Sequence, residues 1–158
     1  MRILTVLLLL NVEVIANDVV VTVSGRVVPL PCTVDTTQLN LDLGQIYVSM
    51  LAQPGSAGAW VNSIIRLSNC PAVTTGITAS FTGQQGTSYY KNNGTARSVE
   101  IQLQSTAGAD LSNGKSLQLP ITAQGTSELP IRVRAYSVGG KATDGTIQGT
   151  INVTYTYQ

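Results

Sequence analysis

The chain lacks histidine altogether: none occurs among its 158 residues. Histidine is the usual general base at neutral pH and a common metal ligand, so its absence excludes Ser-His-Asp and Cys-His catalysis and every histidine-ligated metal site. The acidic residues are scattered along the sequence, which gives no support to a catalytic pair of carboxylates. We therefore expect a protein that is not an enzyme and that holds no metal and no cofactor.

Charge is scarce as well. Charged residues make up 11% of the chain, the net charge is +1, and no basic run occurs, whereas an average soluble protein has about 25% charged residues. Nucleic-acid binding depends on clustered Lys and Arg, and disorder requires high charge with few apolar residues. Both are disfavoured, and an apolar fraction of 43% suffices for the core of a single domain.

No apolar run reaches the ~20 residues of a membrane span. The run at residues 3–10 follows Arg2 and precedes Ala16, and this order of charged, apolar and small residues is typical of a secretory signal. We expect residues 1–16 to be removed after Ala16. The alternative is that this run forms the first strand of the core.

Cysteine is rare, with Cys32 and Cys70 the two in the chain. An even number in an exported chain predicts a disulfide bond and an oxidising compartment. The loop of about 38 residues that it would close contributes roughly 4 kcal/mol in the chain-entropy treatment. Two thiolates without histidine offer too few ligands for a metal.

What the sequence does contain is alternation of apolar and polar residues along most of its length. Alternation with period two predicts half-buried β-strands, and many short strands separated by turn residues predict a β-sandwich. No window has convincing helical periodicity. The strands expected on this basis are residues 18–28, 32–34, 39–43, 61–67, 77–82, 99–104, 129–135 and 147–158.

The first and last of these strands lie at the chain ends. Residues 18–28 carry just Asp18 and Arg26 as charges, and Pro29 and Pro31 end the strand. A long unpaired strand with so little charge is an aggregation hazard that proteins normally blunt. We therefore expect this strand to pair with another molecule.

The residues around these features resemble a known family. Residues 20–28 lead directly into residues 31–34, which contain the first cysteine, and the second cysteine lies within residues 68–71. Gly145 is the fourteenth residue from the C-terminal end, and Tyr157 is the penultimate residue. Together they resemble subunits of chaperone–usher pili. Similarity to the minor tip subunits of type 1 fimbriae lies in segments 78–83, 89–92, 145–148 and 154–157.

The resemblance implies an incomplete immunoglobulin-like β-sandwich that lacks its final strand and is completed by a donated strand. It divides the chain into a signal peptide at 1–16, a donor-strand extension at 17–29 and a pilin domain at 30–158. The donor face would consist of Val19, Val21, Val23, Gly25 and Val27. The acceptor groove and chaperone edge would include Gly145, Ile147, Gly149, Ile151, Val153, Tyr155 and Tyr157.

Four buried valines would contribute about 6–12 kcal/mol before the costs of ordering. Gly25 interrupts the row, either because the acceptor pocket there is shallow or because the strand bends at that point. The expected partners are a periplasmic pilus chaperone, an outer-membrane usher and neighbouring fimbrial subunits that include a tip adhesin.

Three functions remain open at this point. The first is a minor adaptor subunit of an adhesive fimbrial tip, exported through the periplasm to the cell surface. The second is a fimbrial shaft subunit, and the third is a self-contained exported binding or adhesion module. For Tyr89 and Tyr90 a sugar-stacking surface is the alternative to core packing, and for Arg132 and Arg134 a subunit contact is the alternative to solvation.

Overall fold

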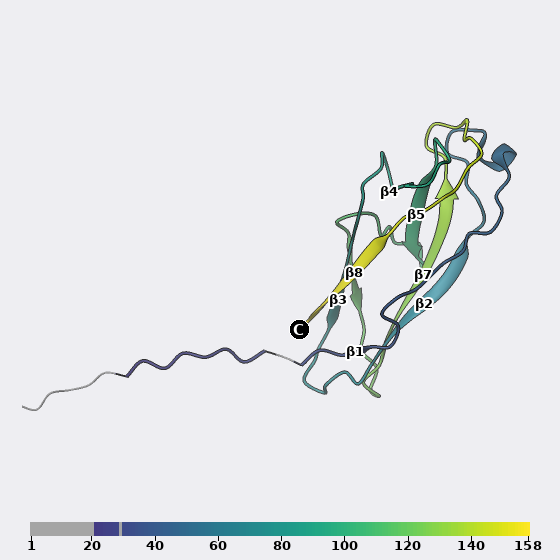
Figure 1. Cartoon of the computed structure of the whole chain (residues 1–158). Helices are drawn as coiled ribbons and strands as arrows, with labels where there is room; N and C mark the ends of the chain where they lie inside the picture. The colour runs from purple at the N-terminus through teal and green to yellow at the C-terminus, as the bar shows by residue number, and fades with distance from the viewer. Residues whose placement is uncertain (1–20, 29) are drawn as a thin grey trace, which may run out of the picture.

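The computed structural model describes residues 21–28 and 30–158, so the predicted signal segment and Val19 lie outside the described residues. The described chain is nearly all strand and loop (Figure 1), which confirms the expected all-β class. Its elements are β1 (Thr33–Val34), η1 (Val48–Leu51), β2 (Val61–Ser68), β3 (Ile77–Gly83), β4 (Tyr90–Lys91), β5 (Glu100–Ser105), β6 (Ser116–Leu119), β7 (Ser127–Tyr136) and β8 (Ile151–Tyr157).

These strands form two antiparallel sheets that pack face to face. The larger sheet has the order β1-β2-β7-β5-β4 and the smaller one the order β6-β3-β8. Alternation puts every second side chain of β3 and β7 between the sheets, as expected for strands with one buried face. The most deeply buried apolar side chains of this core are Leu67, Ile77, Ala79, Phe81, Tyr90, Leu111, Leu129 and Ala135.

Some expectations from the sequence are wrong in detail. Residues 39–43 form no strand, although their leucines alternate with polar residues, because no neighbouring strand is available to pair with them. Residues 21–28 also form no strand, and the C-terminal strand begins at Ile151 rather than at Ile147. The short strand β6 was not predicted.

The predicted disulfide between Cys32 and Cys70 is present. Cys32 directly precedes β1 and Cys70 follows β2, and these strands pair through Thr33 and Ser68. Both cysteines are buried. The bond therefore fastens the start of the folded body to the end of β2.

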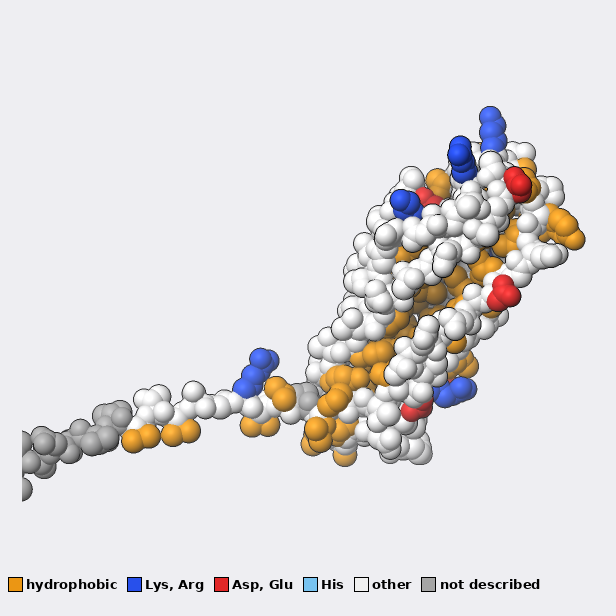
Figure 2. Space-filling model, in the orientation of Figure 1, with side chains coloured by type: hydrophobic (Ala, Val, Ile, Leu, Met, Phe, Trp, Pro, Cys, Tyr) orange, Lys and Arg blue, Asp and Glu red, His pale blue; other side chains and the backbone are white. Residues whose placement is uncertain are grey.

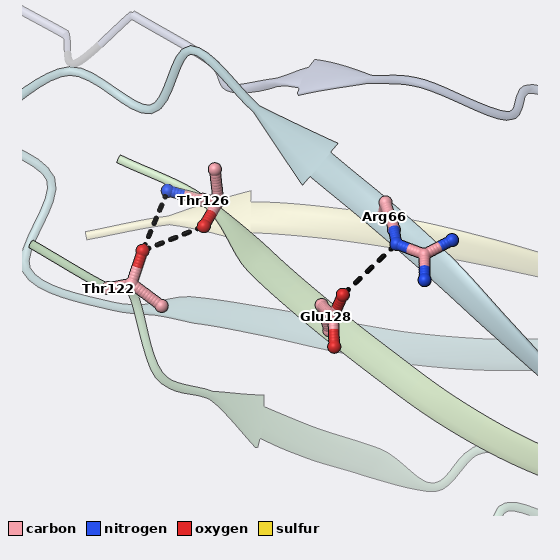
Figure 3. A network of polar contacts seen from close by, with 4 residues as sticks. All are labelled: Arg66, Thr122, Thr126 and Glu128. Atoms are coloured by element: carbon pink, nitrogen blue, oxygen red, sulfur yellow. Dashed lines mark hydrogen bonds and ion pairs between the residues drawn. The ribbon is translucent and has the colours of Figure 1, made fainter. Parts of the chain in front are cut away.

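Polar contacts at the surface join neighbouring strands (Figure 3). Arg66 of β2 donates from Nε to Glu128 of β7 at 3.0 Å, directly across the strand pair. Their side chains are 59% and 54% exposed, so the pair contributes at most ~1 kcal/mol. The hydroxyls of Thr122 and Thr126 lie 2.7 Å apart and close the turn that leads into β7.

The loop that leads into β4 is held by a buried carboxylate. Glu100 accepts hydrogen bonds from the backbone N–H groups of residues 87–89, including those of Ser88 at 2.9 Å and Tyr89 at 2.8 Å. Burial acts to raise the pKa of Glu100, but these hydrogen bonds outweigh it and hold that pKa below 4.5. The carboxylate thus stays ionised and fixes the loop.

Tyr90 is the first residue of β4, and its ring is buried in the core. Its hydroxyl donates to the backbone oxygen of Leu111 at 2.7 Å. Burial, with a contribution from Asp110, raises the pKa of Tyr90 to about 12. Tyr90 is therefore a core residue and offers no surface for stacking a sugar.

Arg132 and Arg134 are part of the packing on the outer face of the larger sheet. Their guanidinium carbons lie 4.5 and 4.1 Å from the ring centroid of Trp60. Arg132 donates to Gln104 at 2.9 Å, and Arg134 donates to Gln102 at 2.7 Å. The arginines therefore link β5 and β7 and are more ordered than a solvated face would be.

Candidate binding groove

The sandwich is open along one side. Strand β8 forms the edge of the smaller sheet and pairs with β3 over its whole length, from Ile77 opposite Tyr157 to Gly83 opposite Ile151. Among the described residues no strand pairs with the other edge of β8. That edge is lined by backbone N–H and C=O groups that a further strand could use.

An apolar groove of about 1270 Å³ runs beside this free edge. One wall is the segment 34–48, which crosses between β1 and η1, and the other is the segment 142–155, which includes β8. The floor consists of side chains from four strands of both sheets, namely Ile65, Phe81, Ile101, Leu103, Ile131 and Val133. Figure 2 shows hydrophobic side chains along the hollow between two rims that are mostly white, the colour of the backbone and of the uncharged polar side chains.

The resemblance to pilus subunits assigned seven residues to an acceptor groove and chaperone edge, and six of them lie on the β8 wall of this groove. Of the seven residues expected there, Gly145, Ile147, Gly149, Ile151, Val153 and Tyr155 line it. Tyr157 does not, and instead packs against the core at the end of β8. Along β8 the apolar side chains are half-buried and the intervening polar ones are exposed, so the apolar row faces the groove.

Two glycines of this wall lie close to neighbouring atoms: a side chain at Gly145 would meet backbone, whereas one at Gly149 would meet the movable end of a side chain. A Cβ at Gly149 would lie 2.5 Å from Cδ1 of Ile101 on the groove floor. A Cβ at Gly145 would lie 2.5 Å from the backbone nitrogen of Ala96, and the φ of Gly145 is 144°, a region that favours glycine. Both glycines therefore let segment 145–149 lie close to the rest of the fold.

The sequence did not predict that the opposite wall, segment 34–48, belongs to a binding site. It contains Leu39, Leu41 and Leu43, which line the groove without belonging to any strand. Leu41 and Leu43 pack against the core, whereas Leu39 is exposed. Their alternation was visible in the sequence, but it predicted a paired strand and gave no indication of an open rim.

The N-terminal segment 21–28 extends away from the body as an arm (Figures 1 and 2). Val21, Val23 and Val27 are 77%, 88% and 99% exposed. A Cβ at Gly25 would meet nothing within 4 Å. The described part of the predicted donor face thus has no partner among the residues that the structure describes.

Comparisons with known proteins agree with this arrangement. A family model described as "Fimbrial protein" matches residues 21–158. Protein FimG of Escherichia coli strain K12 is 44% identical over 155 residues, which cover 96% of this chain and 92% of FimG. The fimbrial-like protein YdeR of the same strain is 43% identical over 145 residues, which cover 90% of this chain and 87% of YdeR.

Among solved structures, the P pilus rod subunit PapA superposes with a TM-score of 0.67. The match covers 82% of this chain and 100% of PapA at 22% sequence identity. A likeness at that identity shows a shared fold. The sandwich is therefore a fold that this chain has in common with a pilus subunit.

Proposed function

The chain belongs to the fimbrial protein family and is a subunit of the chaperone–usher type, and we propose that it serves as a minor adaptor in the tip of an adhesive fimbria. In this proposal the arm completes the sandwich of a neighbouring subunit, and the groove receives the arm of the next. The observation that carries it is the pairing of an open apolar groove with an exposed apolar arm in one chain.

The dimensions of the two features support the proposal. The predicted donor strand, residues 18–28, would span about 36 Å when extended at ~3.3 Å per residue, and the groove wall at 142–155 contains more residues than this strand. Strand addition at a sheet edge gains affinity from main-chain hydrogen bonds and specificity from alternating side chains. The free edge of β8 supplies main-chain groups for the hydrogen bonds, and the valine row of the arm supplies the alternating side chains.

The tip position is supported by the similarity to FimG, which extends over almost the whole chain. We propose a tip adhesin as the neighbour whose groove takes this arm. Before assembly, a periplasmic chaperone would lend its own strand to the β8 edge, and at the outer-membrane usher the arm of the next subunit would replace it. The protein would thus pass through the periplasm to the cell surface.

Deletion of residues 17–28 tests the donor role of the arm. The shortened subunit should remain chaperone-bound and disulfide-bonded, because the described part of the arm, residues 21–28, is exposed. It should fail to join the adhesin when usher, adhesin and chaperone are present. Normal incorporation next to the adhesin would contradict the proposal.

A second experiment tests the β8 edge. Replacing Val153 with Asp, or removing Tyr157 and Gln158, should lower the periplasmic yield because the chaperone no longer captures the subunit. Thr154→Asp is the matched control, since Thr154 is exposed and does not line the groove. Co-purification of the Val153→Asp variant with the chaperone at the wild-type level would place the docking edge elsewhere.

The location of the subunit in the fibre separates the alternatives. Antibody labelling of intact fimbriae should mark their ends if the chain is a tip adaptor. Labelling along the whole length would identify a shaft subunit. Secretion of the chain as a stable monomer without a chaperone would identify a self-contained binding module.

A further inference from the structure

The two walls of the groove carry charge of one sign. Among the described residues that line the groove, the charged ones are Asp42 on one wall and Asp144 on the other. Neither wall segment, 34–48 or 142–155, contains a Lys or an Arg. On the face drawn in Figure 2, Lys and Arg side chains lie toward the ends of the body, and none lies along the middle of the hollow. An occupant of the groove therefore meets a negative potential at both rims.

The carboxylate of Asp42 is held in place at its rim. Its chain neighbours Leu41 and Leu43 pack against the core, whereas Asp42 is exposed. This alternation directs the Asp42 side chain away from the groove floor. One of its oxygens, Oδ1, accepts a hydrogen bond from the N–H of Gly44 at 2.9 Å. A carboxylate accepts about four hydrogen bonds, so this single bond orients the group and leaves capacity for a cation.

Asp144 lies at the start of the other wall and is also exposed. A cationic residue lies near this segment, because the N–H of Arg97 donates to Oγ1 of Thr143 at 3.0 Å. The ion pair formed within the described part of the chain, however, joins β2 to β7 and includes neither rim aspartate. Both carboxylates can therefore pair with an incoming chain, and the positive charge of Arg97 weakens the attraction of Asp144 more than that of Asp42.

A strand in the groove presents its two faces to different surroundings. Alternate side chains point to the apolar floor, and the others point outward between the two rims. Side chains that face each other on neighbouring strands have Cβ atoms about 4.5–5.5 Å apart. An outward Lys or Arg would thus reach a rim carboxylate, whereas an outward Asp or Glu would be repelled. The floor cannot make this distinction, because its side chains carry no charge.

We propose that Asp42 and Asp144 select by charge the arm that enters this groove. The arm of the next subunit has Lys or Arg on its outward face, and arms with Asp or Glu there are disfavoured. This proposal rests on the donor-strand function and specifies the chemistry of the partner's arm. Charges at the rim of an interface act chiefly on the rate of association and on its salt dependence. The aspartates therefore discriminate between arms as they enter, and the apolar row holds the selected arm afterwards.

The experiment uses a library of synthetic peptides with the length of residues 17–28. Alternate positions contain Val, Ile or Gly, and the intervening positions are randomised among Lys, Gln and Glu. The mixture samples many registers, so the position that meets each aspartate need not be known beforehand. The library is incubated with the chaperone-bound full chain. Peptides captured by the chain are sequenced by mass spectrometry, and the ratio of Lys to Glu at each position is compared with that of the starting mixture.

At about 0.1 M NaCl, the captured peptides should be enriched in Lys over Glu about five- to tenfold at one or more outward positions. At about 1 M NaCl, where the Debye length is ~3 Å, the enrichment should fall below about twofold. Asp42→Asn should remove most of the enrichment and Asp42→Asn/Asp144→Asn the remainder. Glu128→Gln is the matched control, because it removes one negative charge from an exposed residue that does not line the groove. It should leave the enrichment unchanged.

The outcomes separate charge selection from the donor-strand function. Capture of peptides with no preference for Lys, or with a preference for Glu, would show that the rims do not select a cationic arm, and the donor-strand function would stand. The same conclusion follows if the preference persists in the double variant or is lost equally in Glu128→Gln. If the unchanged chain captures no peptide, the donor-strand function is wrong and charge selection is wrong with it.

Discussion

A single negative charge moved by one residue along the arm should reveal which face of the arm enters the groove. Val23 belongs to the apolar row, and Ser24 points to the opposite side of an extended strand. Aspartate at position 23 removes the burial of one valine, about 1.5–3 kcal/mol, and also places an unpaired carboxylate against apolar side chains, about 1–3 kcal/mol more.

The sum is about 2.5–6 kcal/mol, which is roughly sixtyfold or more in affinity. Aspartate at position 24 remains in water and should cost no more than ~0.5 kcal/mol. Both variants carry the same added charge, so a difference between their affinities reports which face of the arm carries that charge.

The assay uses three synthetic peptides of residues 17–28: unchanged, with Val23→Asp and with Ser24→Asp. Each is incubated with the chaperone-bound tip adhesin, whose groove is the proposed acceptor of this arm, and the fraction of adhesin that captures peptide is measured by native electrophoresis over a range of peptide concentrations. The unchanged and Ser24→Asp peptides should give similar curves. Equal weakening by the two aspartates would refute the assignment of the valine row to the groove.

Three further predictions concern the stability of the body, measured by urea unfolding of the disulfide-bonded chain. Glu100→Gln should lower the free energy of unfolding by about 1.5–3 kcal/mol at pH 7. Because the folded pKa of Glu100 lies below 4.5, the difference from wild type should persist above that pH and shrink as the pH falls through the folded pKa; a pH-independent difference contradicts this. Tyr90→Phe should cost about 1–3 kcal/mol, since the oxygen of Leu111 loses its buried donor, and an unchanged midpoint contradicts it. Replacing both cysteines with serine should cost about 2–5 kcal/mol, whereas equal stability with and without reductant would show that the bond is dispensable.

The strands that the sequence predicted best are those with one fully buried face. Residues 77–82 and 129–135 alternate between core and surface, and β3 and β7 have this burial pattern in the structure. A slip of one residue would move every apolar side chain of such a strand into water, so the pattern specifies both the strand and its register. The structure adds which strands are neighbours, because pairing partners far apart in the chain leave no local signal.

The alternation of apolar and polar residues gave a wrong prediction where the segment has no neighbouring strand to pair with. The leucines at 39–43 alternate as a strand would, but their segment forms a groove wall and pairs with nothing described. In β5 the reverse occurs, because Glu100 and Gln102 look like an exposed polar face and are both buried. Each has a specific partner for its polar atoms, and such partners come from loops and strands that periodicity does not bring together.

The groove is the feature that periodicity was least able to predict, because a missing strand contributes no residues to a sequence. Its β8 wall was assigned from the resemblance to pilus subunits, and its floor consists of core positions that look like those of any sandwich. What the residues did indicate was a valine-rich arm with few charges, and its described part, residues 21–28, is exposed. An apolar strand without a site and an apolar site without a strand are each unfavourable in water. Since the two lie on the same chain, association of successive subunits of this architecture removes both costs at once, and a fibre is the geometry that allows every subunit to do so.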